Sequence, residues 1–301
     1  MAKPTIANVA ELAGVSQATV SRALRGATNV TEETRIKVQR AADQLNFTLS
    51  KSASALASGK TMRVILLVSG KLNEWFNSGV LQGVYEELAP VGYDVTPAFI
   101  TDRSELDRFF SQLPKSRNAE AIIISSFQLM PAMRDQLQAI DLPTVGVNVP
   151  AESGYFDASI SIDNSSAMTM AVRLLRSLGH TNIAFCSDYI PADMVYNTSQ
   201  RTQAFADAAQ ANATDGITFS LLTADAHDAP LSKSDLASQL TAKLLSLPER
   251  PTAVCVETDQ VAIALVKELR KQQLNVPEDI SVLGFDDAEI AQAADLSTIR
   301  Q

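Results

Sequence analysis

The stretch TIANVAELAGVSQATVSRALRGATNVTEETRIKVQRAADQL, residues 5–45, decides how the chain begins to fold, because it carries signals for three short helices. Thr5 is a hydroxyl N-cap, and small or branched apolar residues then recur at helical spacing on one face as far as Ala13. Gly14 ends this helix, since glycine adopts a positive φ without steric cost. Ser16 begins a second helix after a turn of two residues, and Thr31 begins a third.

The second predicted helix has two unlike faces. Its apolar side carries Val20, Ala23 and Leu24, and its polar side carries Gln17, Ser21 and Arg22. The third helix has Glu32 and Glu33 in its first turn, where the helix dipole favours anions. Its apolar face consists of Val38, Ala41, Ala42 and Leu45. Two short helices joined by a tight glycine-containing turn are typical of a helix-turn-helix, whose second helix lies in the major groove of DNA.

Charge separates this interpretation from its alternative, an ordinary three-helix cap with solvated polar residues. The whole chain of 301 residues has a net charge of −9, which argues against nucleic acid. Residues 1–60, however, hold eight Lys or Arg against four acids, a net of +4, whereas the remainder holds 17 basic and 30 acidic residues, a net of −13. A cationic head on an acidic body favours DNA binding by the head, where Gln17 can read adenine and Arg22 guanine or phosphate.

Few other features of the composition restrict the function. Cys186 and Cys255 lie in the apolar runs IAFC and AVCV, so we expect buried small side chains and no disulfide or metal site. No run of about 18 apolar residues occurs, and the N-terminus lacks the apolar core of a signal peptide. The sequence therefore predicts a cytoplasmic protein with 46% apolar residues and a sizeable core.

Residues 46–61, NFTLSKSASALASGKT, break the composition of the head. They form either a plain tether or a short conditional helix capped by Ser50, too short to be stable alone. On such a helix Leu56 is the only bulky apolar side chain, and it can act as a wedge in the minor groove.

From Met62 onward short apolar strands alternate with amphipathic helices, the pattern of parallel βαβ units. The predicted strands are residues 62–68, 94–99, 121–125, 144–149, 158–162, 182–186, 217–222, 252–256 and 280–285. The predicted helices between them are residues 76–91, 104–113, 130–140, 164–178, 199–212, 232–247 and 259–273. Two such sets predict two doubly wound lobes with a ligand cleft at the carboxyl ends of the strands.

Motifs along the whole chain resemble the lactose/galactose-repressor family of bacterial transcription regulators. In the head these are VAELAGVS, ATVSR, TEETR and Leu45-Asn46-Phe47. In the body they include Asp163-Asn164, Leu178-Gly179-His180, Arg201 with Phe205, residues 276–282, Gly284-Phe285-Asp286-Asp287 and residues 296–301. The resemblance implies an all-α helix-turn-helix head at residues 1–46, a hinge at 47–61 and a two-lobed, periplasmic-binding-protein-like effector domain at 62–301. The first lobe is expected at about 62–160 and the second at about 161–298.

The resemblance also implies a homodimer that binds a pseudo-palindromic DNA operator and responds to a small molecule, usually a sugar, between its lobes. Carried over by position, the recognition helix offers Ser16, Gln17, Ala18, Thr19, Ser21 and Arg22. The positions that contact phosphate are Thr5, Asn29, Thr31 and Thr34, with Leu56 as the minor-groove wedge. The effector-binding positions are Asn73, Trp75, Phe76, Asn148, Arg201, Asp259 and Asp286. No cofactor or metal is implied.

Each effector position has a plainer alternative. Trp75 can be a packing residue, Arg201 a surface charge, Asp259 a helix N-cap and Asp286 a loop cap. The chain also departs from the family, which often has Asp-Arg at Asn148-Val149 and Asn at Thr258. Family members continue a few tens of residues past Gln301 to complete the first lobe, so the resemblance predicts that this C-terminal return is lacking.

Three functions compete on these grounds. The leading prediction is an effector-controlled repressor, with a truncated, non-responsive regulator as a variant of it. A sugar-binding module with no DNA role is opposed by the basic head. An enzyme is disfavoured because the two histidines, His180 and His227, have no evident nucleophile or metal partner and no phosphate-binding glycine loop occurs. His180, just past Gly179, is instead expected to make a hydrogen bond at a helix end.

Overall fold

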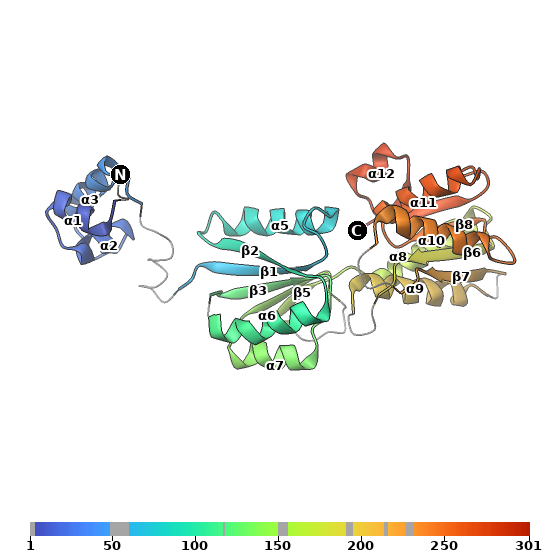
Figure 1. Ribbon diagram of the computed structural model, residues 1–301, viewed down its shortest axis with the longest axis horizontal. Coiled ribbons are helices and arrows are strands. Elements are labelled where there is room, and N and C mark those ends of the chain that lie inside the picture. Colours follow the sequence, from blue (N-terminus) through green and yellow to red (C-terminus); the bar gives the residue numbers. More distant parts are fainter. Residues whose placement is uncertain are drawn as a thin grey trace.

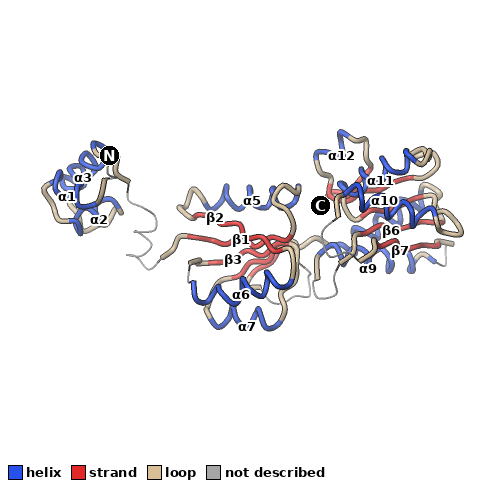
Figure 2. The backbone as a smooth tube through the Cα atoms, viewed as in Figure 1, coloured by secondary structure: helices blue, strands red, loops and turns tan. Residues whose placement is uncertain are grey.

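The computed structural model describes residues 4–48, 60–116, 118–149, 156–190, 195–213, 216–226 and 231–301. The head is entirely helical, whereas the rest of the chain alternates strands and helices (Figure 1, Figure 2). Of the predicted hinge, residues 49–59 lie outside the described residues, and so do Leu56 and His227.

The head consists of α1 (Ile6–Ala13), α2 (Gln17–Leu24) and α3 (Glu32–Gln44). All three helices begin at the predicted caps: the Thr5, Ser16 and Thr31 hydroxyls accept hydrogen bonds from the backbone N–H three residues on. Gly14 takes a φ of 68° after α1, as the positive-φ turn requires. The predicted apolar faces meet in one small core built from Val9, Val20, Val38 and alanines, so the three-helix prediction is confirmed.

The first lobe is a parallel sheet in the order β2-β1-β3-β4-β5. Its strands are β1 (Arg63–Ser69), β2 (Asp94–Ile100), β3 (Ala121–Ser125), β4 (Thr144–Val147) and β5 (Ala158–Ile160). Its helices are α5 (Trp75–Leu88), α6 (Arg103–Ser116) and α7 (Pro131–Ala139). Residues 64–68 are all buried because β1 lies between α5 on one face and α6 and α7 on the other (Figure 1). Pro97 is accommodated because β2 is an edge strand.

The second lobe repeats this architecture with the strand order β10-β9-β8-β6-β7. Its strands are β6 (Asn182–Ser187), β7 (Thr218–Thr223), β8 (Ala253–Val256), β9 (Ser281–Asp286) and β10 (Ser297–Arg300). Its helices are α8 (Asn164–Ser177), α9 (Asn197–Ala211), α10 (Lys233–Leu245), α11 (Asp259–Lys271) and α12 (Glu289–Ala293). The side chains of α8 and α9 form one core with the sheet and those of α10 and α11 a second, so helices cover both faces.

Backbone contacts join the two lobes directly. Phe127, which follows β3 of the first lobe, forms an antiparallel bridge with Tyr196 at the start of α9. Gln128 N donates to Val195 O at 2.8 Å, and Asn197 N donates to Ser126 O at 2.9 Å. The carboxyl end of β3 is therefore tied to the amino end of α9, which places the polar ends of both sheets at one junction.

Several predicted elements need correction. The strand expected at 144–149 ends at Val147, because Asn148 takes a φ of 52°, and the strand expected at 158–162 ends at Ile160. The helix expected at 199–212 begins two residues earlier, at Asn197. The short α12 and β10 were not predicted. Cys186 and Cys255 are free and buried, as predicted.

Candidate functional site

The outer face of α2 presents the predicted base-reading residues. The Ser16 hydroxyl accepts from Thr19 N at 3.1 Å, and Val20 and Ala23 are buried against α1 and α3. This packing leaves Gln17, Ala18 and Arg22 exposed. Ser21 is half-buried, and its carbonyl accepts from Arg25 Nε at 3.0 Å. The face therefore carries an amide and a guanidinium, the groups that read adenine and guanine edges.

The predicted phosphate-contacting hydroxyls lie at helix amino ends. The Thr5 hydroxyl accepts from Asn8 N at 3.4 Å, and the Thr31 hydroxyl accepts from Thr34 N at 3.4 Å and lies 2.9 Å from the Thr34 hydroxyl. Asn29 is exposed in the loop before α3. Helix amino ends carry partial positive charge and free N–H groups, so this geometry suits phosphate oxygens.

A cluster of polar side chains, called the polar edge below, lies at the carboxyl ends of the strands of the second lobe. It contains Arg201, Asn164, Glu257 and Asp286, and Arg201 is its central side chain. Arg201 is 2% exposed, and its guanidinium carbon lies 3.7 Å from the centroid of the Phe285 ring. Its Nη1 donates to the Glu257 carbonyl at 2.5 Å and lies 3.4 Å from Asp286 Oδ1, while Nε donates to Asn164 Oδ1 at 3.3 Å. Burial lowers the pKa of Arg201, yet an arginine stays charged at neutral pH. The surface-charge alternative is therefore wrong.

A run of buried amides leads from Arg201 to the first lobe. Asn164 Nδ2 donates to Asn197 Oδ1 at 2.8 Å, and Asn197 Nδ2 donates to Asn148 Oδ1. All three asparagines are at most 7% exposed. Asn148 lies at the end of β4 in the first lobe, whereas Asn164 and Asn197 begin α8 and α9 in the second. A continuous side-chain network therefore crosses the junction between the lobes.

The two predicted aspartates play different structural parts. Asp286 ends β9 with a φ of 130°, and its Oδ1 contacts both Arg201 and the Gln301 amide. Burial raises the pKa of Asp286 to about 6, against the opposing effect of the Arg201 charge. Asp259 is fully buried, and its carboxylate accepts from Thr298 Oγ1 at 2.5 Å and Ala288 N at 2.9 Å.

Burial also raises the pKa of Asp259. The alternative that Asp259 is a helix N-cap is wrong, because Thr258 holds the cap position of α11. Both carboxylate oxygens of Asp259 are occupied by groups from the segment between β9 and β10.

The predicted residues of the first lobe lie on the loop after β1 and the start of α5. Trp75 is 36% exposed, so it is not a core residue, and its ring centroid lies 6.2 Å from that of Phe76. Asn73 is exposed. The loop is held by Asn77, a buried residue the sequence reasoning missed, whose Nδ2 donates to Ser69 O at 2.7 Å and Lys71 O at 3.0 Å.

Two more residues of the polar edge were missed. Asn197 gave no signal, because an asparagine before a helix reads as an ordinary cap. Glu257 did have a signal in the sequence, because an acid directly follows the apolar strand AVCV at the carboxyl end of β8. Glu257 is 5% exposed, and burial raises its pKa to about 7. His180 does make the predicted helix-end contact: its Nδ1 lies 2.9 Å from Thr252 Oγ1.

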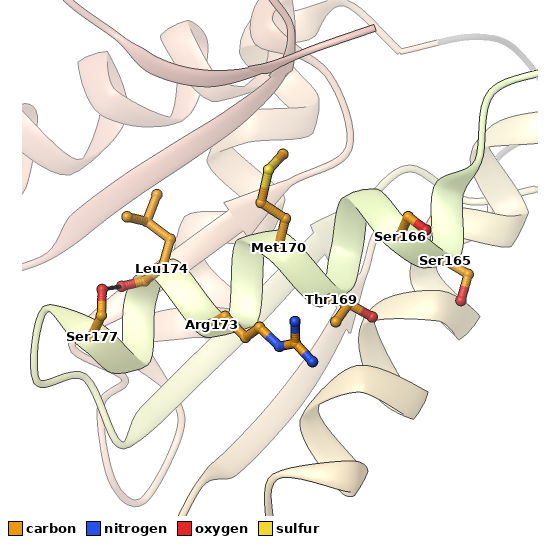
Figure 3. Close-up of a pocket in the computed structure, with 7 residues that line it drawn as sticks. All are labelled: Ser165, Ser166, Thr169, Met170, Arg173, Leu174 and Ser177. Carbon is orange, nitrogen blue, oxygen red and sulfur yellow. Dashed lines mark hydrogen bonds between the residues drawn. The ribbon is translucent and has the colours of Figure 1, made fainter.

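A depression of about 550 Å³ lies along α8, and none of the predicted site residues lines it. Figure 3 shows that its seven lining side chains all belong to α8, with Met170 and Leu174 on one side and Thr169 and Arg173 on the other. A depression along a single exposed helix lacks the converging polar groups of an effector site. Within the described ranges, no helix is long and apolar enough to span a membrane.

Comparisons with known proteins find matches to both the head and the second lobe. Residues 5–50 match the model of the bacterial regulatory proteins of the lacI family, and residues 172–301 match a periplasmic binding protein-like domain. The transcriptional repressor PurR of Vibrio cholerae is 30% identical over 99% of this chain and 86% of its own length. The lac repressor dimer bound to operator and the anti-inducer ONPF superposes with a TM-score of 0.82 at 24% identity, over 100% of this chain and 88% of that one.

The regulator CelR in complex with cellobiose superposes with a TM-score of 0.63 at 26% identity, covering 99% of this chain and 88% of that one. A basic three-helix head with a reading helix, two parallel lobes with a shared polar junction, and full-length similarity to a repressor lead to one assignment. The chain belongs to the lacI family of bacterial regulatory proteins and is a DNA-binding transcriptional repressor under the control of a small-molecule ligand.

Proposed function

We propose that this repressor binds a pseudo-palindromic operator as a homodimer and acts in the cytoplasm by binding alone, without catalysis. Residues 1–46 form the DNA-binding head, residues 47–61 the hinge, and residues 62–301 the effector and dimerisation domain. The first lobe extends to about residue 160, and the second covers about 161–298. Two heads in a dimer would contact two half-sites about one helical turn apart.

Base reading is assigned to α2. Its exposed Gln17 and Arg22 suit bidentate contacts to adenine and guanine, and Ala18 suits apolar contact with a thymine methyl group. The remaining recognition residues are Ser16, Thr19 and Ser21. Register on the duplex is assigned to the phosphate contacts of Thr5, Asn29, Thr31 and Thr34, because phosphate contacts position a protein without reading sequence. Leu56 would enter the minor groove at the operator centre.

The effector is proposed to be a carbohydrate held between the lobes. Trp75 and Phe76 offer an aromatic face for the C–H surface of a sugar, and Asn73 and Asn148 offer amides for its hydroxyl groups. Arg201 and Asp286 supply the fixed polar groups of the second lobe. Asp259 acts indirectly, by holding the backbone that carries Asp286. The bound cellobiose of the similar regulator CelR supports this class of ligand.

Control of DNA binding requires that the effector prefer one arrangement of the lobes. The amide run from Arg201 through Asn164 and Asn197 to Asn148 supplies such a route, because a ligand that contacts Arg201 alters a group bonded directly to the junction. A changed junction would alter the spacing of the two heads and therefore the operator affinity.

The observation that carries the proposal is the coexistence of an exposed reading helix in a basic head with a buried polar network that crosses the lobes. The test selects the preferred duplex from a random pool with the full chain and then measures its affinity with and without a panel of sugars. We expect a symmetric site, and one sugar that changes its affinity at least about tenfold. Sugar binding without any preference for duplex sequence would instead favour the sugar-binding module.

A matched variant sharpens this test. Arg201→Met removes the guanidinium at the centre of the polar edge and leaves the head unchanged. It should abolish the response to sugar while the selected duplex still binds, whereas Arg173→Met on the exposed face of α8 should keep the response. A full response in the Arg201 variant would refute the assignment of the effector to this edge.

A further inference from the structure

Glu257 stands at the carboxyl end of β8, in the middle of the second lobe's sheet. Its backbone N–H donates to Cys186 O at 3.0 Å, so it lies beside the end of β6. On its other side β9 ends at Asp286. Because the carboxyl ends of parallel strands meet at one edge, the Glu257 carboxyl belongs to the same polar edge as Arg201 and Asp286. It is 5% exposed.

The cations near Glu257 do not form an ion pair with its carboxyl. Arg201 bonds the backbone carbonyl of Glu257, and its other contacts are Asn164, Asp286 and the Phe285 ring. Lys233, at the start of α10, acts on Glu257 only through its charge. Over the residues that the structure describes, no ion pair joins Glu257 to any lysine or arginine.

The electrostatic surroundings leave an excess of negative charge. Asp188, just past β6, donates its backbone N–H to the Glu257 carboxylate, which favours the charged form, but the Asp188 charge opposes it. Lys233 and Arg201 favour the charged form, and burial opposes it most strongly. A buried carboxylate without a full counter-charge is costly, and such groups in proteins are normally paired.

The residue that follows Glu257 in the sequence, Thr258, has a buried polar atom without a hydrogen-bond partner among the described residues. The hydroxyl oxygen of Thr258 is buried and makes no hydrogen bond within the described part of the chain. Thr258 is the N-cap of α11, yet its side chain does not cap the helix. Buried polar atoms are nearly always satisfied, so an unsatisfied one at a ligand-binding edge indicates a group that a ligand completes.

We propose that the effector carries a protonated amine, which forms an ion pair with the Glu257 carboxylate, and a further polar group, which bonds the Thr258 hydroxyl. An amino sugar is the class of ligand that combines this cation with the hydroxyl groups expected for the rest of the cleft. An ammonium group donates three hydrogen bonds and accepts none, which suits a carboxylate, because a carboxylate only accepts. This inference rests on the proposed function, since it names the chemistry of the same effector.

The test compares matched ligands by calorimetry at pH 7 with the full chain. D-glucose and D-galactose are paired with D-glucosamine and D-galactosamine, and cellobiose and glucose 6-phosphate complete the panel. A hydrogen bond between charged groups predicts that an amino sugar binds about 10- to 100-fold more tightly than its neutral parent. Equal affinity for each pair, tighter binding of the phosphate, or no binding of any amino sugar would overturn the inference.

Two isosteric variants locate the effect. Glu257→Gln should reduce the affinity for the amino sugar to that for its parent, whereas Glu249→Gln, at an exposed acid of the same lobe, should keep the preference. The wild-type comparison stands without either variant. Failure here is distinguishable from failure of the proposed function: a neutral sugar that releases operator DNA supports the repressor and refutes the amine, whereas loss of operator selection refutes the repressor itself.

Discussion

The burial of Glu257 should make the stability of the ligand-free protein depend on pH in a way that one substitution removes. Burial raises the pKa of Glu257 from 4.5 to about 7 in the folded chain. Between these two pH values the folded state binds more protons than the unfolded state, so the free energy of unfolding falls as the pH rises. The contribution of Glu257 is thus nearly neutral below the unfolded pKa and fully unfavourable above the folded pKa.

The size of the effect follows from the two pKa values. A shift of one unit corresponds to about 1.4 kcal/mol, so the ionised Glu257 costs about 3 kcal/mol at pH 8 and below about 1 kcal/mol at pH 5. Glu257→Gln keeps the shape of the side chain and an oxygen that can accept from Asp188 N. The variant should therefore be more stable than the wild type by about 3 kcal/mol at pH 8, which is about 6–12 °C in Tm for a domain of this size.

Urea unfolding between pH 5 and pH 8.5, followed by circular dichroism without ligand, measures this difference directly. Taking the difference between the two proteins at each pH cancels the contributions of titrating groups that do not interact with Glu257. Glu249→Gln, at an exposed position of the same lobe, is the matched control for the substitution itself. A stabilisation by Glu257→Gln that is equal at pH 5 and pH 8, or a loss of stability at pH 8, would refute the argument that burial dominates at this site.

Three further substitutions test other parts of the molecule. Gln17→Ala should lower the preference for the selected duplex over random duplex by about 5- to 150-fold, measured by fluorescence anisotropy. The control Lys271→Ala should leave this preference unchanged. An unaltered preference in the Gln17 variant would contradict base reading by α2. Gly14→Ala should destabilise the head by about 1 kcal/mol through its φ of 68° alone, since no atom lies within 4 Å of the added carbon; unchanged hydrogen exchange in α1 refutes this. Asn197→Ala should lower the free energy of unfolding in urea by about 1–3 kcal/mol, because the buried Asn148 side chain loses its hydrogen-bond partner. An unchanged free energy of unfolding would contradict the hydrogen bond between Asn197 and Asn148.

The head could be predicted from the sequence because its signals are local. The hydroxyl caps, the glycine after α1 and the apolar spacing lie within a few residues of the structure they specify. The strands of both lobes were predictable for a related reason: a buried parallel strand is a nearly continuous apolar run, and β1 and β8 are such runs.

The elements that escaped prediction lack a strong local signal. Helix α12 has five residues, too few for an apolar period, and β10 buries only Ile299 among its four residues. Their structure depends on Asp259, whose carboxylate holds Ala288 and Thr298 from a distance of 29 and 39 residues in the chain. A contact of this kind has no counterpart in a sequence window.

For the same reason, the individual residues of the site could be predicted from the sequence, whereas the contacts between them could not. Arg201 and Asp286 were expected by position from the resemblance to the family, but their meeting depends on the strand order of the second lobe.

Asn197 shows the limit most clearly, because its side chain joins partners 33 and 49 residues away, one in each lobe. Only the antiparallel contact between the end of β3 and the start of α9 brings those partners together. The residue that gave no signal in the sequence is therefore the one through which a ligand at Arg201 would reach the first lobe.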